Sequence, residues 1–433
     1  MSRQIRLLFG INIFWLALSV LFDGVNTLVL PLQLSGLADQ HNEATILGLL
    51  TFVGLLAGAF IQPIAGAFSD RLQPLLGRRG FIAGGLLLSL GSLFFFATFQ
   101  SIFGLMASYL AIQASASIAQ AGQQALIPDL VDEKQRGLAS GLKGFMDLTG
   151  AMLGFILLGQ LLGSGQSLLA VGVMGGILVV AYTLGALLTP EDRPTKGVEI
   201  KTNAIPLQTI FSLDLTRHTA FLRLVLARFL FLLGVYGTGR FLLLFVANRL
   251  GLAEDQAAQH AGNLLAGLAL ITILASPIAG WLADRIGRVQ LMISGAIFSA
   301  ISALLLIWTT STSQILLFGG LMSFGSAAFA GGSWALLADL VPKKESARFF
   351  GLANFSTAGS AAVAGLFGPI IDGVERISPG LGFSVLFLVA SLSFLASILP
   401  LKDHLWKEAG ESASGRGLAV VSVLADPAAI EED

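Results

Sequence analysis

The sequence predicts an all-α membrane protein with twelve transmembrane helices arranged as two pseudo-symmetric six-helix bundles. Hydrophobic residues make up 55% of the chain and charged residues 12%, against about 45–50% and 25% in soluble globular domains. The apolar residues fall in twelve runs of about 20 residues, which is long enough to cross a bilayer as a helix. Two short motifs recur in the same order in the second half of the chain, which indicates two homologous halves.

The twelve runs follow one another with short polar connections, except for one long connection in mid-chain. They cover residues 7–34, 44–70, 80–99, 102–127, 138–162, 168–188, 221–246, 259–283, 290–308, 314–337, 349–371 and 381–399. We therefore expect a first bundle at 1–189, a proline-containing cytoplasmic linker at 190–219 and a second bundle at 220–401. The Ser-, Gly- and Ala-rich remainder, 402–433, is expected to be a disordered cytoplasmic tail.

Lysines and arginines of the connections set the expected orientation. With the amino terminus inside, the outer connections hold only Arg249 and Arg376, and all other loop cations lie inside. We expect a multi-pass protein of the cell membrane with both termini in the cytoplasm.

The repeated motifs lie at the inner ends of the runs. Residues 62–71 (QPIAGAFSDR) recur as 276–285 (SPIAGWLADR), 214 positions later. Residues 125–131 (ALIPDLV) recur as 335–341 (ALLADLV), 210 positions later. After the first motif the chain is expected to turn tightly at Pro74 and Gly77.

The Gly-x-x-x-Asp-Arg-x-x-Gly-Arg pattern resembles the signature loop of major facilitator superfamily transporters. The second half has the common short spacing from Asp284 to Gly287, whereas Gly77 stands seven residues after Asp70. That longer loop is similar to the loop of the glycoside-pentoside-hexuronide and sucrose-type cation symporters. The resemblance, over about 9–401, implies the major facilitator fold, in which two halves rock about one central site.

Carboxylates beside the repeated loops are expected to act as gates. Asp70 and Asp284 can each face a helix amino terminus of the opposite half, or a loop arginine, when the cytoplasmic side is closed. Arg136 and Arg348 are candidate partners for Asp129 and Asp339. The alternative is that the arginines only obey the positive-inside rule. The expected gating residues are Asp70, Arg71, Gly77, Arg78, Arg79, Asp129, Arg136, Asp284, Arg285, Arg288, Asp339 and Arg348.

Ionisable residues within the runs are expected to face a cavity or a partner. Asp23 is the clearest case, on one helical stripe with Ser19, Asn26 and Thr27. In the seventh run, Arg228, Tyr236 and Arg240 share a face. The 214-residue offset relates Arg240 to Asn26, so Asp23 and Arg240 are expected at a similar depth. Arg228 can pair with Asp147 or a backbone carbonyl, and Arg240 can hold an anionic substrate group.

The expected substrate and coupling residues gather on the helices that line the central cavity in the superfamily fold. They are Asp23, Asn26, Tyr109, Gln113, Gln120, Asp147, Arg228, Tyr236, Arg240, Trp334 and Asn354. Amides, hydroxyls, aromatic rings and one carboxylate suit a neutral, hydroxyl-rich solute. The alternative for each single polar group is a hydrogen bond between helices that binds nothing.

These features favour proton-coupled transport of a sugar, with Asp23 as the titrating group. A second hypothesis is a proton-driven exporter of amphipathic compounds, and a third is a non-transporting receptor or assembly factor. An enzyme is not expected, because the chain lacks phosphate-loop, metal-ligand and nucleophile–base patterns. The expected partners are a small-molecule substrate, protons and the lipid bilayer, with no cofactor, metal or nucleic acid, and the protein is expected to be a monomer.

Overall fold

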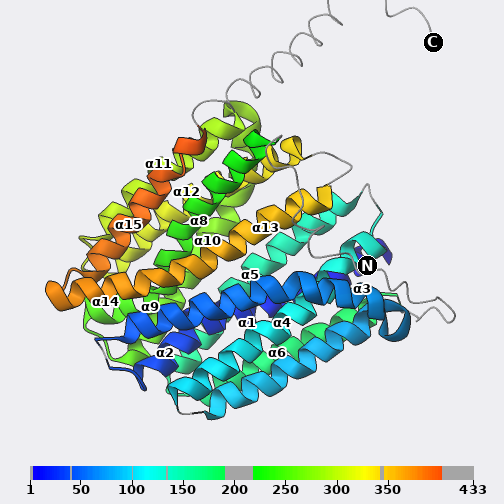
Figure 1. The fold of residues 1–433 in the computed structure, drawn as a ribbon, viewed down its shortest axis with the longest axis horizontal. Coiled ribbons are helices and arrows are strands. Elements are labelled where there is room, and N and C mark those ends of the chain that lie inside the picture. The colour runs from blue at the N-terminus through cyan, green and yellow to red at the C-terminus, as the bar shows by residue number, and fades with distance from the viewer. Residues whose placement is uncertain are drawn as a thin grey trace, which may run out of the picture.

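The computed structural model describes residues 3–39, 41–99, 101–132, 135–190, 218–341 and 346–401, which form helices joined by short connections. Within these residues, twelve helical spans are long and apolar enough to cross a membrane. The predicted all-α fold with twelve spans is therefore confirmed. Figure 1 shows the helices of the first half, in blue to teal, beside those of the second half, in green to orange.

The first half contains six spans. They are α1 (Arg3–Gly24) continued by η1 (Val25–Val29) and α2 (Leu30–Ser35), α3 (Glu43–Thr98), which holds two spans, α4 (Ile102–Leu130), α5 (Arg136–Gly163) and α6 (Ser167–Leu188).

The second half repeats this order. Its elements are α8 (Thr219–Arg240) continued by α9 (Leu242–Leu250), α10 (Glu254–Ile286), α11 (Arg288–Leu306), α12 (Thr312–Leu340), α13 (Ser346–Val363) continued by η4 (Ala364–Leu366) and α14 (Phe367–Ile377), and α15 (Gly382–Ala396) continued by η5 (Leu399–Leu401). The expected linker, beyond its first and last residues, and the expected tail lie outside the described residues.

The first repeated loop is tighter than the sequence predicted. Helical turns continue through Pro74, and the chain leaves helical geometry at Gly77, with φ 66° and ψ 170°. Gly287, with φ 94°, separates α10 from α11 in the second half. Both angles favour glycine because a Cβ atom would clash with the backbone.

Small residues let the helices of each half approach closely. A Cβ atom added at Gly85 of α3 would lie 2.5 Å from the backbone nitrogen of Ala119 in α4. Gly295 occupies the corresponding position in α11, where a Cβ atom would lie 2.5 Å from the carbonyl oxygen of Gly325. The high glycine content thus serves backbone-to-backbone packing, as is common between membrane helices.

The two halves touch at the end of the molecule opposite the repeated loops. We call the end that holds the repeated loops the motif end, and the end where the two halves touch the opposite end. At the opposite end a Cβ atom at Gly365 would lie 2.3 Å from the carbonyl oxygen of Gly48, and one at Gly262 would lie 2.6 Å from that of Phe155. The labels α2, α9 and α14 mark this end in Figure 1, where the two halves converge.

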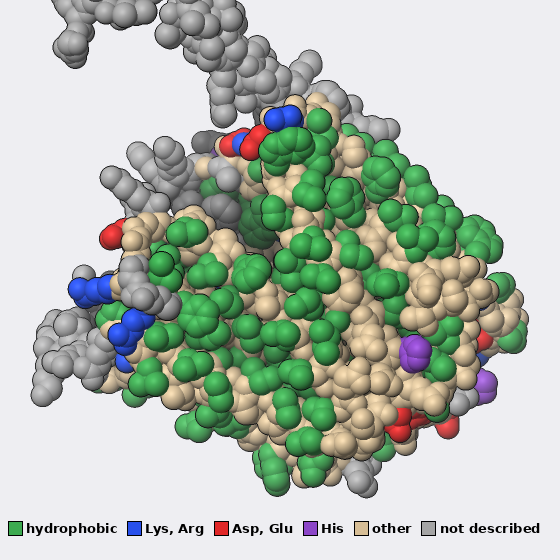
Figure 2. Space-filling view, turned by 180° about the vertical axis from the view of Figure 1, so that it is seen from behind, with side chains coloured by type: hydrophobic (Ala, Val, Ile, Leu, Met, Phe, Trp, Pro, Cys, Tyr) green, Lys and Arg blue, Asp and Glu red, His purple; other side chains and the backbone are tan. Residues whose placement is uncertain are grey.

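Toward the motif end the two halves diverge. Gly159 of α5 packs against Gly262, whereas a Cβ atom at Gly141, on the same face five turns earlier, would meet nothing within 4 Å. The structure is therefore closed at the opposite end and open between α5 and α10 toward the motif end. Figure 2 shows apolar side chains over the flank of the molecule and charged side chains toward its two ends, as a membrane-spanning bundle requires.

Candidate functional site

The first and seventh spans are interrupted at corresponding positions. Residues Val25–Val29 form a π-helical turn, after which the N–H of Leu30 bonds to the carbonyl of Val25. The next residue, Pro31, has no N–H, and such a gap in the hydrogen-bond ladder is a common cause of a local irregularity. In the seventh span α8 ends at Arg240 and α9 begins at Leu242. Paired interruptions of this kind mark the substrate site in several transporter folds.

The π-helical turn brings Asn26 against α4. Tyr109 donates its hydroxyl proton to Asn26 Oδ1 at 2.6 Å, and Gln113 Nε2 donates to the same oxygen at 3.1 Å. Gln113 Nε2 also lies 2.7 Å from the Tyr109 hydroxyl oxygen. All three side chains are buried. Three of the predicted site residues are therefore brought together, and they bond to one another.

Arg240 reaches this group from the second half. Its Nη2 donates to the carbonyl of Ala361 at 3.4 Å, whereas Nε and Nη1 are buried without a hydrogen-bond partner. The guanidinium lies within hydrogen-bonding reach of the Tyr109 hydroxyl and interacts electrostatically with Tyr109, Tyr236 and Asp23. Asp23 is half-buried and interacts with the charge of Arg240, which agrees with the similar depth predicted for the two residues. We call the set Asp23, Asn26, Tyr109, Gln113, Tyr236 and Arg240 the central cluster.

Asp147 lies beside the central cluster with its own partners. Its carboxylate accepts a hydrogen bond from Ser19 at 3.4 Å and lies 3.6 Å from the ammonium of Lys143. Lys143 in turn sits 4.0 Å above the ring of Trp15. Asp147 also contributes to the electrostatic environment of Asp23. Lys143 is not among the residues that the sequence predicted for this site.

The possible pairing of Arg228 with Asp147 is wrong. Arg228 Nη1 donates to Ser333 Oγ at 2.5 Å, and the guanidinium lies 4.3 Å from the ring centre of Trp334. Both partners belong to α12, so Arg228 fixes the packing of α8 on α12 within the second half. Trp334 stays 43% exposed. Among the other predicted residues, Asn354 is exposed and Gln120 is half-buried, and neither joins the central cluster.

The gating layer at the motif end is built from arginines that follow the two glycine turns. Arg78 lies 2.7 Å from Asp70 and 2.8 Å from Asp129, and Arg288 forms the corresponding ion pair with Asp339. The predicted partnership of Arg136 with Asp129 is wrong. Arg136 instead donates to the carbonyls of Pro128 and Val131, because those carbonyls at the end of α4 lack helical partners.

The other predicted gating residues lie around this layer. Arg79 donates to the carbonyl and hydroxyl oxygens of Thr189, and Arg285 lies 4.1 Å from the ring centre of Trp281. Arg71 is half-buried and Asp284 is exposed, and the side chain of Arg348 lies outside the described residues. Asp70 has the loop arginine Arg78 as its partner, which is the second of the two expected possibilities, and the ion pairs of Arg78, Lys143 and Arg288 each stay within one half.

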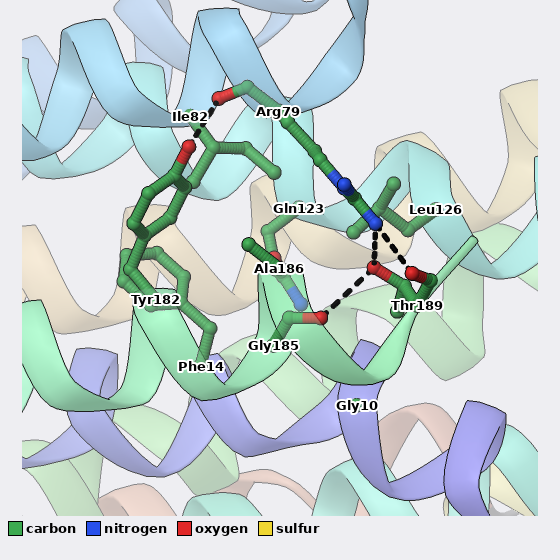
Figure 3. A pocket seen from close by; sticks show the side chains of 10 residues that line it. All are labelled: Gly10, Phe14, Arg79, Ile82, Gln123, Leu126, Tyr182, Gly185, Ala186 and Thr189. Atoms are coloured by element: carbon green, nitrogen blue, oxygen red, sulfur yellow. Dashed lines mark hydrogen bonds between the residues drawn. The ribbon is translucent and has the colours of Figure 1, made fainter. Parts of the chain in front are cut away.

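A small pocket lies apart from the central cluster, among α1, α3, α4 and α6 near the motif end. Figure 3 shows Arg79 reaching across it to Thr189, with Tyr182 and Phe14 on the other side. The Tyr182 hydroxyl donates to the carbonyl of Arg79 at 3.1 Å. Its lining belongs to the first half alone, whereas the central cluster draws on both halves.

Residues that hold the opposite end closed were not singled out from the sequence. Asp372 of α14 accepts a hydrogen bond from the backbone N–H of Thr45, near the start of α3, at 2.6 Å. Arg376 donates to Asn42 Oδ1 and to the carbonyl of His41. The only signal in the sequence was Asp372 itself, an acidic residue directly after the expected run 349–371. An acidic residue in that position is typical of an ordinary loop.

A family model described as Major Facilitator Superfamily matches residues 14–259 and 224–422. The chain belongs to the Major Facilitator Superfamily. Membership makes it a membrane transport protein and not an enzyme, and it agrees with the two halves and the shared site described above.

Several bacterial members of the superfamily are similar over part of the chain. The multi-drug resistance efflux pump PmrA of Streptococcus pneumoniae is 35% identical over 162 residues, 37% of this chain and 39% of PmrA. The tetracycline resistance protein, class H, of Pasteurella multocida is 27% identical over 36% of this chain and 38% of its own length. The multidrug resistance protein MdtG of Enterobacter lignolyticus is 33% identical over 37% of each. Each match covers less than two fifths of the relative.

Solved structures of the superfamily share the fold over nearly the whole chain. The human organic anion transporter MFSD10 (TETRAN) superimposes with a TM-score of 0.65 at 18% identity, over 93% of this chain and 100% of that one. A peptide transporter POT in complex with sulfate gives 0.68 at 13% identity, over 93% and 99%. The resemblance to the glycoside-pentoside-hexuronide branch is not confirmed, because the sequence relatives above are named for efflux or drug resistance.

Proposed function

We propose that the chain is a proton-driven secondary transporter that exports amphipathic compounds from the cell by alternating access. The observation that carries this proposal over sugar uptake is the sequence similarity to PmrA, MdtG and a tetracycline resistance protein. The interior agrees with this proposal, because the amides of Asn26 and Gln113 are engaged with each other and with Tyr109, while two donors of the Arg240 guanidinium remain for a ligand.

In the proposed cycle, residues 1–189 and 220–401 move as two bodies about the central cluster. The distribution of loop cations places the motif end in the cytoplasm of a cell whose surface membrane holds the protein. The described state is then closed to the outside by the contacts of Gly48 with Gly365 and of Asp372 with Thr45. Because the central cluster draws on both halves of one chain, a monomer suffices.

Asp23 is the proposed proton carrier. It lies half-buried within the first span, beside the π-helical turn, and senses both Asp147 and Arg240. A carboxylate there can exchange its charge for a proton as the halves move, which couples substrate to the proton gradient. The half-buried Tyr236 and the exposed Trp334 supply ring faces for the apolar body of a substrate.

Export is tested in a drug-sensitive bacterial host that lacks its principal efflux pump. Cells expressing the chain should accumulate less tetracycline, norfloxacin or ethidium than empty-vector cells, and a protonophore should abolish the difference. Equal accumulation of every compound with and without the protein would contradict the proposal.

Proton-coupled sugar uptake remains the second candidate. It is favoured by the amides and hydroxyls of Asn26, Gln113 and Tyr109, which could open to a sugar if their mutual bonds break. Proteoliposomes supplied with labelled mono- and disaccharides and an inward proton gradient decide the matter. Sugar accumulation would establish this candidate, and its absence beside drug efflux would remove it.

A further inference from the structure

We infer that Arg240 binds an anionic group of the substrate, so that the compounds exported are amphipathic organic anions such as aromatic carboxylates. This inference rests on the proposed export function and specifies the substrate class of the same site.

The guanidinium of Arg240 is buried, 5% exposed, yet incompletely paired. Nη2 has one long contact, at 3.4 Å, to the carbonyl of Ala361, and Nε and Nη1 have no hydrogen-bond partner. Buried polar groups in native proteins are nearly always satisfied, because an unpaired buried donor is strongly unfavourable. Each of these two free donors forms a fork with Nη2, which still has a second hydrogen to donate, and either fork matches the two oxygens of a carboxylate.

The positive charge of Arg240 is not neutralised by an ion pair with a described carboxylate. Among the described cations buried in the interior, Lys143 pairs with Asp147, and Arg228 is held by Ser333 and the ring of Trp334. Arg240 interacts with Asp23 only through the electrostatic field, since no ion pair joins these two described residues. No described carboxylate forms an ion pair with Arg240, so a substrate anion would balance its buried positive charge.

At the break next to Arg240 the carboxyl-terminal end of α8 meets the amino-terminal end of α9, so the two helix dipoles oppose each other and the free N–H groups of α9 are what favours an anion. The nine-residue helix α9 begins at Leu242, directly after the break at Phe241. The first N–H groups of a helix have no partner within it, and the amino-terminal end of the helix dipole is positive. A cationic side chain and a helix amino terminus at one interruption of a spanning helix form an arrangement suited to an anion.

The surroundings of Arg240 also supply an apolar contact for the rest of such a molecule. Tyr109 comes from the first half and Tyr236 lies one helical turn before Arg240, and both interact with the guanidinium. Tyr109 is fully buried and Tyr236 is half-buried, so the apolar body of a molecule with its carboxylate on Arg240 would lie against Tyr236. A neutral compound of the same shape would leave Nε and Nη1 unpaired, which predicts selectivity for the anion.

Dansylglycine and dansylglycinamide form a matched fluorescent pair that differs in one negative charge. We expect the purified protein to bind dansylglycine at least about tenfold more tightly than the amide, a difference typical of one charge-assisted hydrogen-bonded contact. In Arg240→Gln the two probes should bind alike, with the affinity for the amide retained. Arg240→Lys should keep part of the preference, because it keeps the charge and loses the planar fork.

Arg249→Gln is the matched control, since Arg249 lies at the opposite end and donates to the carbonyl of Ile307. It should bind both probes as the wild type does. The retained affinity of Arg240→Gln for the amide shows that this variant is folded, and an unchanged melting temperature is a second check.

The outcomes separate this inference from the export proposal. Equal binding of both probes to the wild type, or an undiminished preference in Arg240→Gln, would overturn the anion site while drug efflux from cells could still stand. Conversely, an Arg240-dependent preference for dansylglycine in a protein that lowers the accumulation of no compound would support the anion site and reject export.

Discussion

Arg240 and Asp23 lie on two related spans and interact through their opposite charges, yet no ion pair joins these two described residues. A direct pair would neutralise both groups and leave little for a substrate or a proton to change. Their separation allows each to have its own ligand, a proton for Asp23 and an anionic group for Arg240, with the field between them linking the two events.

We predict that Asp23→Asn uncouples transport from the proton gradient. Asparagine has nearly the same shape but cannot release a proton, so gradient-driven efflux should fall to the level of passive exchange while exchange itself continues. Proteoliposomes loaded with a fluorescent substrate measure both rates. Asp39→Asn, an exposed loop residue, is the control and should behave as the wild type. Gradient-driven efflux that survives in Asp23→Asn would show that the proton is carried elsewhere.

Sequence periodicity predicted which residues share the interior but not their bonding partners. The face of Arg228, Tyr236 and Arg240 was predictable because helical spacing determines it. The partners depend on distances between helices, which the sequence does not contain. Arg228 bonds to Ser333 and packs on Trp334 instead of pairing with Asp147, and Arg136 bonds to carbonyls at the end of α4 instead of pairing with Asp129.

At the scale of elements, glycines and helix breaks determine where the two halves can meet. The eleventh span changes from α13 through η4 to α14, and there Gly365 and Gly368 press against the backbone of α3. No side chain intervenes at these two contacts, so they can separate without a side chain having to repack. This favours an interface that opens and closes repeatedly.

We predict that Gly368→Ala opens the opposite end. The new Cβ atom would lie 1.9 Å from the carbonyl oxygen of Ala44, which is backbone and cannot turn aside. Overpacking of this kind costs about 1–3 kcal/mol, and about 1.4 kcal/mol shifts an equilibrium tenfold. A cysteine at Thr45→Cys should therefore react with an impermeant thiol reagent about tenfold faster. Gly373→Ala, on the same helix with open space around it, should leave the rate unchanged. Equal rates in both variants would mean that α14 does not close this end.

The elements themselves were largely predictable, because twenty-residue apolar runs have no alternative in a bilayer. The local breaks within the helices could not be predicted from the sequence. The turn at Gly77 occupies one residue where a longer loop was expected, and the π-helical turn at Val25–Val29 follows from the missing N–H of Pro31. Such breaks arise from single backbone groups and leave only a weak trace in hydropathy.

On the scale of the whole molecule, the two halves are closed against each other at the opposite end and open at the motif end, although they are built alike. The offset of 210 residues relates not only the motifs but also the ion pairs Arg78–Asp129 and Arg288–Asp339. It relates the helix caps Ser101 and Ser311 as well. Symmetry of this kind lets the same two bodies form a second, mirrored closure at the motif end. The sequence predicted the symmetry, but not which end this structure would close.

The central claim is that the central cluster opens to one end at a time, so that transport requires the closed opposite end to open. Asn42 and Arg376 are in contact across that end, and because the chain has no cysteine, Asn42→Cys with Arg376→Cys would hold its only thiols. We would join this pair with a cleavable bifunctional thiol reagent and measure substrate efflux from proteoliposomes before and after reduction. The account predicts that cross-linking stops efflux, that reduction restores it, and that either single variant treated alike keeps it. Efflux at the full rate through the cross-linked protein would contradict the account.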